Sequence, residues 1–251
     1  MTRPFRLIRR ATPVQMPDRT TTRTAGTAPV HPARSGHWAM YATSIFPRLM
    51  EWVLRGERFQ TERQLLLAPA HGVVLEIGFG TGLNLPHYPL AVTALHTVEP
   101  AMLLPDRVAR RVASVPFPVH LHRLSAEGLP FDDGLFDYAV STFTLCTIPD
   151  PSAALREVRR VLKPDGRLLF LEHGRSDDPS IARWQDRLNP LQQIVACGCN
   201  LNRRIDQLVV QAGLRLEQFD RYTLPGVPRI GGEMYRGMAY LNGHPKTIHL
   251  P

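Results

Sequence analysis

The chain has 251 residues, 43% of them hydrophobic, which is enough for one domain with a core of ordinary size. Its formal net charge is +8, but residues 1–36 contain seven arginines and one acid, Asp18, and so carry six of these charges. The rest of the chain is only weakly basic, and we therefore expect no binding of nucleic acid.

The first 36 residues are rich in Arg, Thr, Pro and Ala and lack apolar periodicity, so we predict a disordered basic segment at 1–36. A targeting peptide and a translation start at Met40 are the alternatives. No run approaches the roughly 18 apolar residues of a membrane span, so we predict no transmembrane segment, while peripheral membrane contact stays open. The three cysteines are too few for a disulfide framework, which favours reduced thiols and a cytoplasmic location.

Apolar residues recur at steps of three and four between residues 44 and 67, with an interruption at Gly56. This spacing predicts one helix or two short ones, ended by Pro69. The apolar run 73–77 then predicts a buried parallel strand that leads into glycines. Predicted strands at 94–98, 119–124, 136–142 and 167–172 alternate with predicted helices at 101–112 and 152–162. The alternation indicates an α/β fold, an open and mostly parallel sheet with helices on both faces.

Two further helices are predicted at about 179–194 and 203–212, followed by strands near 214–222 and 233–241. We predict one domain over 40–251, with a ligand-binding core at 70–175. In open α/β sheets a ligand binds outside the carboxyl ends of the strands. The segments free to cover that crevice are 44–67 and 176–212, and we expect them to bind a second substrate.

A glycine loop follows the first predicted strand, in the sequence Glu76-Ile-Gly78-Phe79-Gly80-Thr-Gly82. Alternate glycines let a backbone turn sharply and approach a ligand closely, and a turn without a ligand would need fewer of them. A dinucleotide site normally shows G-x-G-x-x-G, whereas here the third glycine comes two residues after the second. The spacing favours S-adenosyl-L-methionine over NAD as the cofactor.

Glu99 and Pro100 come directly after the predicted strand 94–98. A carboxylate at this strand end can accept two hydrogen bonds from the 2′,3′-diol of a ribose. The alternative is an ordinary surface glutamate. NAD enzymes also place an acid here, so Glu99 by itself does not separate the two cofactors.

These segments resemble a methyltransferase family that includes the ubiquinone and menaquinone C-methyltransferases. Leu75 to Leu83 resembles its first motif, Val98-Glu99-Pro100 its ribose-binding acid, and Ser125-Ala-Glu-Gly-Leu-Pro-Phe131 its adenine-binding segment; 136–142 resembles its fourth strand and 157–166 the helix and turn before its fifth. The resemblance covers roughly 70–240. It implies a Rossmann-like class I fold with a mostly parallel seven-stranded sheet and S-adenosyl-L-methionine as cofactor.

The same resemblance places Ser125, Ala126 and Glu127 at the adenine and Thr142 at the end of the fourth strand. Ser125 departs from the family pattern, which usually has an aspartate that accepts a bond from the adenine amino group. A serine can still accept that bond, and the backbone around Ala126 is the alternative contact.

Three stretches resemble the thiol S-methyltransferase-like branch of the family: Thr144-Leu-Cys-Thr-Ile148, Leu171-Glu-His-Gly174 and Gly198-Cys-Asn-Leu-Asn-Arg203. Its animal members carry an apolar N-terminal membrane anchor that is not found here, so a thiol, a quinol or phenol, and other small metabolites stay open as methyl acceptors. A phospholipid amine is a further alternative. A non-catalytic S-adenosylmethionine-binding module and an NAD-dependent oxidoreductase are the alternatives of another class. The sequence predicts a small-molecule methyltransferase and leaves its oligomeric state open.

Methyl transfer from a sulfonium is an in-line displacement that depends mainly on positioning. His173 is the candidate catalytic residue, as a base or as a group that orients the acceptor, and a structural histidine is the alternative. Cys197-Gly-Cys199 lacks the second ligand pair of a zinc site, so we predict no metal. We expect the cysteines and Trp184 to be packing residues.

Overall fold

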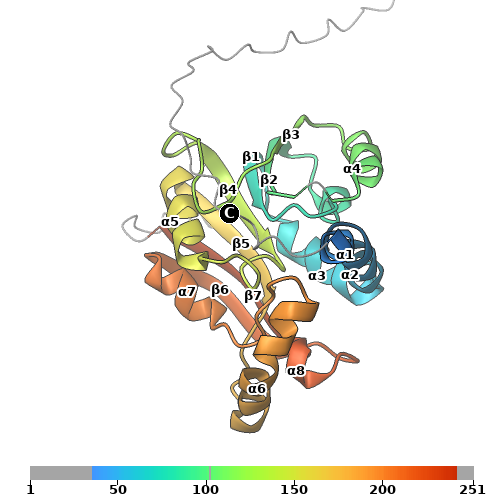
Figure 1. The fold of residues 1–251 in the computed structure, drawn as a ribbon. Coiled ribbons are helices and arrows are strands. Elements are labelled where there is room, and N and C mark those ends of the chain that lie inside the picture. Colours follow the sequence, from blue (N-terminus) through green and yellow to red (C-terminus); the bar gives the residue numbers. More distant parts are fainter. Residues whose placement is uncertain (1–35, 102, 242–251) are drawn as a thin grey trace, which may run out of the picture.

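The computed structural model describes residues 36–101 and 103–241, which form a seven-stranded sheet in the order β3-β2-β1-β4-β5-β7-β6 (Figure 1). Strands β1 to β5 are parallel, and β7 runs antiparallel to both of its neighbours. The strands are β1 (Gly72–Ile77), β2 (Val92–Val98), β3 (Val119–His122), β4 (Phe136–Thr142), β5 (Leu162–His173), β6 (Leu214–Thr223) and β7 (Glu233–Leu241). The predicted α/β class with a mostly parallel seven-stranded sheet is confirmed.

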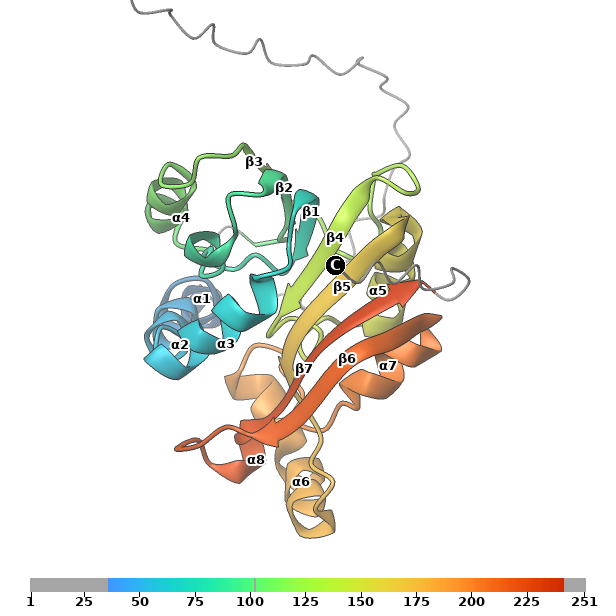
Figure 2. The same ribbon diagram turned by 180° about the vertical axis from the view of Figure 1, so that it is seen from behind.

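Side chains of successive strand residues enter two different cores, because they point to opposite faces of a sheet. Along β5, Leu168 and Phe170 pack in one core, whereas Leu169 and Leu171 pack in the other. Helices α5 (Pro151–Val161) and α7 (Ile205–Gln211) cover the first face, and α3 (Glu57–Leu67) covers the second (Figure 2). Burial on both faces explains the near-continuous apolar runs that identify these strands in the sequence.

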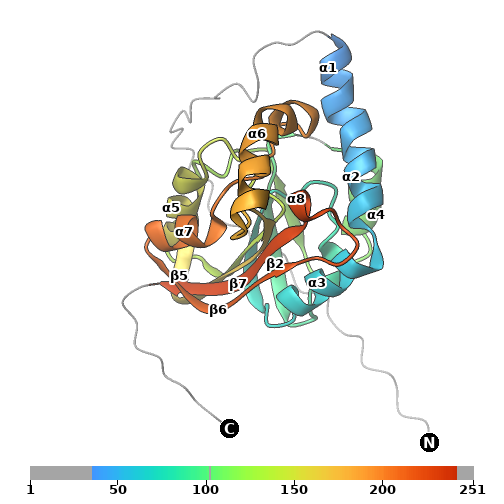
Figure 3. The ribbon, with the colours of Figure 1, turned by 90° about the horizontal axis from the view of Figure 1, so that it is seen from below.

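The helix before the sheet is longer than predicted and contains one π-helical turn. Helix α1 (Gly36–Met40), the π-turn η1 (Tyr41–Ile45) and α2 (Phe46–Leu54) follow one another without a break, and Figure 3 shows them as one long helix. The amide of Phe46 donates to the carbonyl of Tyr41, five residues back. The predicted interruption at Gly56 is confirmed, because Gly56 has an extended backbone and α3 begins at the next residue.

Most predicted elements agree with the structure to within two residues, and β4 and β7 agree at both ends. The helix predicted at 101–112 begins only at Pro105, as α4 (Pro105–Val112). Leu104 has a left-handed backbone, with φ of 44°, and proline favours the first helical position. Strand β5 begins earlier than predicted, because Leu162 already pairs with Phe136 before the ladder shifts register.

The remaining helical elements are α6 (Pro179–Val195) and α8 (Arg229–Gly232) in the C-terminal half, and the 3-10 turn η2 (Leu85–His87) between β1 and β2. Among the described residues, no helix combines the length and the apolar character that a membrane span needs. The predicted disordered segment 1–36 lies outside the described residues, apart from its last residue.

Candidate functional site

The glycine loop after β1 needs glycine at all three positions, because Gly78, Gly80 and Gly82 have φ angles of 71°, 56° and 79°. A Cβ on Gly78 would lie 2.0 Å from Oγ1 of Thr144, so this position is also closed by packing. A Cβ on Gly80 would have no described atom within 4 Å. Gly80 therefore faces open space at the carboxyl edge of the sheet, where a ligand can approach its backbone.

Glu99 joins this loop to the end of β2. Its carboxylate accepts hydrogen bonds from the amides of Gly80 (3.0 Å) and Ala101 (3.2 Å). Burial raises the pKa of Glu99, and these two amides act against that rise. Pro100, the next residue, is exposed. The structure thus brings Glu99 to the open side of the loop, in the place where a ribose-binding acid is expected.

Glu76 lies beneath the loop, with 1% of its surface exposed. Its two carboxylate oxygens accept hydrogen bonds from Asn84 Nδ2 (2.9 Å) and from the Tyr88 hydroxyl (2.7 Å). Asn84 Nδ2 also donates to Thr142 Oγ1 (2.9 Å), and its Oδ1 accepts from Nε of Arg63 (3.1 Å). Glu76 and Thr142 therefore hold Asn84, which directly follows the glycine loop, and they shape the loop from below.

Burial dominates the electrostatics of this network. It raises the pKa of Glu76 to about 7, although the hydrogen bonds from Tyr88 and Asn84 and the charge of Arg63 act to lower it. Burial also lowers the pKa of Arg63 to about 10. Phe79 packs in the core on the same side of the sheet.

The predicted adenine segment forms a turn after β3. Ser125 Oγ donates to a Glu127 carboxylate oxygen (2.8 Å), and the other oxygen of Glu127 accepts from the Asp150 amide (2.7 Å). The side chain of Ala126 is buried in the core, so only its backbone is left to face a ligand. The Ser125 hydroxyl is already hydrogen-bonded to Glu127. Ser125 therefore has less hydrogen-bonding capacity left for an adenine than the aspartate that is usual in the family.

The loop after β4 connects the glycine loop to the end of β5. Thr144 Oγ1 donates to the carbonyl of Gly78 (3.3 Å), and the Thr144 amide donates to Glu172 Oε1 (3.0 Å). Glu172 is fully buried and also accepts from Ser141 Oγ and from the amides of Leu145 and Cys146. The carboxylate of Glu172 therefore fixes the backbone that leads to Cys146.

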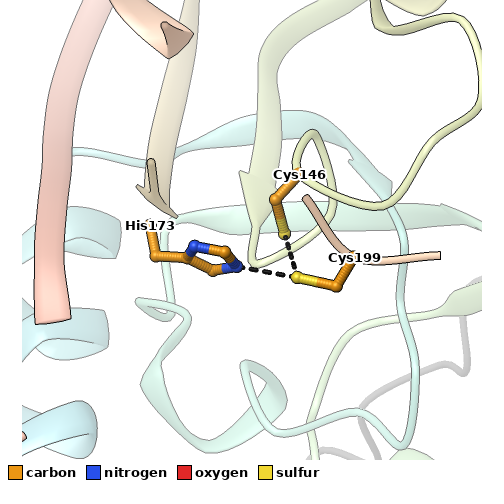
Figure 4. A group of neighbouring side chains, drawn as sticks. All are labelled: Cys146, His173 and Cys199. Atoms are coloured by element: carbon orange, nitrogen blue, oxygen red, sulfur yellow. Dashed lines mark hydrogen bonds between the residues drawn. The ribbon is translucent and has the colours of Figure 1, made fainter. Parts of the chain in front are cut away.

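His173 lies at the end of β5 beside two cysteines (Figure 4). Its Nε2 is 2.8 Å from Cys199 Sγ, which is 3.6 Å from Cys146 Sγ. Burial of the ring acts to lower the pKa of His173, but the contact with Cys199 outweighs it and the pKa is raised. Its Nδ1 is buried and has no hydrogen-bond partner among the described residues.

The segments expected to bind a second substrate meet at these side chains. Phe46 of α2 packs against a small cluster formed by Cys146, Ala196 and Cys199. The Tyr41 hydroxyl donates to the carbonyl of Val195 (2.6 Å), which ties the N-terminal helix to the end of α6. We call the group of Phe46, Cys146, His173, Ala196 and Cys199 the thiol wall.

Sequence reasoning missed the polar residues that hold the two loops. Arg63 and Asn84 support the glycine loop, and Glu172 supports the loop after β4. The sequence does indicate the role of Glu172, because an acid that follows a run of buried strand residues needs several hydrogen-bond partners. Arg203, which precedes α7, is also a polar residue that holds a loop: its guanidinium donates to the carbonyls of Leu145 and Ile148 in the loop after β4.

The strand order, the glycine loop and the acid after β2 define a class I methyltransferase. A family model described as "Methyltransferase domain" matches residues 75–170. A thiol S-methyltransferase of Homo sapiens is 30% identical over 216 residues, covering 79% of this chain and 87% of that protein. The chain therefore belongs to the S-adenosylmethionine-dependent methyltransferases, and it is a small-molecule methyltransferase.

Two further matches agree with this family. A ubiquinone/menaquinone biosynthesis C-methyltransferase of Vibrio cholerae is 38% identical over 104 residues, covering 39% of this chain and 40% of that protein. A 1,6-didemethyltoxoflavin-N1-methyltransferase of Burkholderia thailandensis, solved with S-adenosylhomocysteine, has the same fold, with a TM-score of 0.58, 17% identity, and coverage of 84% of this chain and 92% of that one. The residues around Gly80 and Glu99 fit the cofactor, since they combine an open glycine backbone with a carboxylate for its ribose.

Proposed function

We propose that this enzyme transfers the methyl group of S-adenosylmethionine to the sulfur of a small, largely apolar thiol. The observation that carries the proposal is the convergence of three segments that resemble the thiol branch. They lie far apart in the sequence, yet each contributes one member of the thiol wall: Cys146, His173 and Cys199. The relationship to a thiol S-methyltransferase over most of the chain supports the same acceptor.

The composition of the thiol wall suits such an acceptor. Phe46 and Ala196 offer apolar contacts, and sulfur atoms of cysteine are soft and polarizable neighbours for another sulfur. The buried Nδ1 of His173, which lacks a partner among the described residues, offers one hydrogen bond to the acceptor. The wall is joined to the cofactor loop through Thr144, whose hydroxyl bonds to Gly78.

The bound cofactor supplies an electrophilic methyl group, and the protein mainly has to position the acceptor for in-line attack. A free thiol has a pKa of about 8.5, so only a few per cent of it is thiolate at neutral pH. The guanidinium of Arg203 bonds to the loop that carries Cys146, and its positive charge favours an anion near the wall. Arg203 and His173 therefore orient and stabilise the attacking sulfur.

A methyl-release assay across matched thiol, quinol and amine acceptors tests the proposal. We expect the highest kcat/KM with an apolar thiol, and Glu99→Ala serves as the control that weakens the cofactor site. Transfer only to a quinol or phenol, or only to a phospholipid amine, would overturn the thiol assignment. Binding of S-adenosylmethionine without turnover on any acceptor would indicate a binding module.

We also propose that the enzyme contacts the surface of an anionic bilayer from the cytoplasmic side. Two helices expose apolar rows at helical spacing, which consist of Ile45, Leu49 and Trp52 on the N-terminal helix and Trp184, Leu188, Leu191 and Val195 on α6. Trp184 is 53% exposed, so the expectation that it is a packing residue was wrong. Free thiols at all three cysteines support the cytoplasmic location.

Basic side chains accompany these rows, as binding to anionic lipid requires. Arg48 and Arg55 are exposed on and beside α2, and Arg55 lines a surface depression with three arginines of α4, two of which form salt bridges with Glu51. Sedimentation with vesicles that contain phosphatidylserine tests this contact. We expect Trp52→Ala with Trp184→Ala to weaken binding severalfold, and equal binding of wild type and variant would contradict it.

A further inference from the structure

Cys146, His173 and Cys199 place three metal-binding atoms within 4.8 Å of one another. They come from three elements: the loop after β4, the end of β5, and the segment between α6 and α7 (Figure 4). Two thiolates and one imidazole form a ligand set that Zn²⁺ prefers, and a zinc site with three protein ligands keeps one position open. The sequence spacing gave no sign of this, because the three residues lie 26 or 27 positions apart.

We propose that Cys146, Cys199 and His173 bind a zinc ion whose fourth position receives the sulfur of the methyl acceptor. The metal site stands on the geometry of this chain alone. Only the identity of the fourth ligand rests on the proposed thiol acceptor. Spacing along the sequence predicted no metal, and the proposal replaces that expectation.

The observed distances can be compared with those of a tetrahedral zinc site. Bonds of about 2.3 Å to sulfur and 2.0 Å to nitrogen place two sulfurs about 3.8 Å apart and a sulfur and a nitrogen about 3.5 Å apart. The two Sγ atoms are 3.6 Å apart, which already fits. The His173 Nε2 is 2.8 Å from Cys199 Sγ, so the imidazole has to move away by about 0.7 Å to admit the ion.

The backbone around the three ligands is fixed by hydrogen bonds independent of any ion. The Cys146 amide donates to Glu172, and the Cys146 carbonyl accepts from the amide (2.8 Å) and the side chain (3.0 Å) of Asn200. These bonds join the loop after β4 to the residue that follows Cys199. His173 is the last residue of β5 and pairs with Met234 of β7. Such a framework lowers the entropy that ligand residues lose on binding a metal.

The charges around the cluster also suit a metal with an additional anionic ligand. Two thiolates balance the charge of Zn²⁺, so the thiolate of an acceptor adds one negative charge. Arg203 is held by the carbonyls of Leu145 and Ile148 and interacts electrostatically with Cys146, Cys199 and the carboxylate of Glu172. Its guanidinium offsets that charge. The carboxylate of Glu172 is turned to backbone amides and to Ser141.

At the proposed site, methyl transfer accounts for the proton of the thiol, for the bonds formed and broken, and for the leaving group. The acceptor thiol binds in the fourth position as a thiolate and releases its proton to solvent, since metal binding deprotonates thiols at neutral pH. A sulfur lone pair forms the new bond to the methyl carbon while the bond from that carbon to the cofactor sulfonium breaks. The electron pair of the broken bond stays on the cofactor sulfur and gives neutral S-adenosylhomocysteine. The product thioether is a weaker ligand than a thiolate and leaves the site.

Metal analysis of the full chain, purified under reducing conditions with added zinc and then desalted, tests the site. We expect about one zinc per chain in the wild type and less than a tenth of that in Cys146→Ser with Cys199→Ser. Cys197→Ser is the matched control, since Cys197 lies in the same segment and outside the cluster, and it should keep its zinc. No zinc in the wild type, or equal zinc in the double variant, would overturn the proposal.

Cobalt gives a second measurement that needs no variant and so does not depend on how the variants fold. We expect Co²⁺ to give the intense visible absorption of a tetrahedral site and a near-ultraviolet band from thiolate-to-metal charge transfer. An octahedral spectrum without the charge-transfer band would refute the site. Addition of an apolar thiol should change the spectrum, whereas an equivalent phenol should not, and an unchanged spectrum would refute the assignment of the fourth ligand.

These results separate the metal site from the proposed function. Zinc binding without thiol methylation would contradict the thiol acceptor and leave the metal site in place. Thiol methylation at full rate by a zinc-free protein would contradict the binding of the acceptor sulfur to the metal and leave the thiol acceptor in place. Recovery of a disulfide between Cys146 and Cys199 from the reduced, zinc-treated protein would overturn the metal site.

Discussion

Replacement of Glu76 by glutamine should change how the stability of the free protein depends on pH. The folded pKa of Glu76 is about 7, above its ordinary value of 4.5, because the side chain is fully buried. A carboxyl group with a raised pKa favours folding when it is protonated. Its contribution is therefore fully present below pH 4.5 and is lost as the pH rises through about 7.

The size of this effect follows from the shift. One pKa unit corresponds to about 1.4 kcal/mol, so ionisation of Glu76 costs about 3 to 4 kcal/mol in total, of which about 2 to 3 kcal/mol falls between pH 5 and pH 8. A glutamine keeps the size and neutral charge of the protonated acid beside Tyr88 and Asn84. Between pH 5 and pH 8 the free energy of unfolding of the variant should therefore rise by about 2 to 3 kcal/mol relative to that of the wild type.

Urea unfolding of both proteins at pH 5, 6, 7 and 8, without cofactor, measures the difference. The other titrating groups are common to both, so they cancel in the comparison. Glu57→Gln, on the exposed surface of α3, is the control for removal of a carboxylate outside the buried network. If the free energies of unfolding of wild type and Glu76→Gln changed in parallel with pH, Glu76 would not change its charge in this range. The reasoning from burial would then be refuted.

Glu99→Ala should weaken S-adenosylmethionine binding by about 1.5 to 3 kcal/mol in calorimetry, because a charged hydrogen-bonding group is lost, and unchanged affinity would remove Glu99 from the site. Gly78→Ala should lower the melting temperature by several degrees, since its Cβ meets Thr144 at 2.0 Å. Gly80→Ala should reduce cofactor affinity but lower the melting temperature less than Gly78→Ala does, because its Cβ points into open space. A lower melting temperature with unchanged cofactor affinity would place the ligand elsewhere. His173→Ala should reduce methyl transfer at least tenfold while cofactor affinity stays within about threefold, and loss of both would contradict a separate acceptor side.

The cofactor half of the molecule was predictable from the sequence, because its signals are local. Three alternate glycines and an acid at the next strand end lie within two neighbouring parallel strands and the short connection between them, and their spacing already implies the geometry around Gly80 and Glu99. The strands could be located for a related reason. Burial on both faces leaves a continuous apolar run such as 73–77.

The acceptor half depends on contacts between distant residues, and no local pattern encodes them. Cys146, His173 and Cys199 each look like an isolated residue in the sequence, and only the return of the α6–α7 segment to the sheet edge brings them together. The same holds for Arg63, whose partner Asn84 lies 21 residues away. The prediction that Trp184 is a packing residue was wrong for a different reason. An aromatic residue at helical spacing indicates an apolar face of a helix, but it does not indicate what covers that face.

The π-turn at Tyr41–Ile45 sets the rotational phase of the N-terminal helix. Each residue of an α-helix advances the chain by about 100°, so the extra residue of a π-turn offsets the two ends of the helix by that angle. The offset lets Tyr41 reach Val195 while Phe46 faces the thiol wall. A homologue that lacked one residue here would continue as a regular α-helix and turn its first two turns toward a different neighbour. The length of this short segment therefore governs which side of the helix packs against the thiol wall.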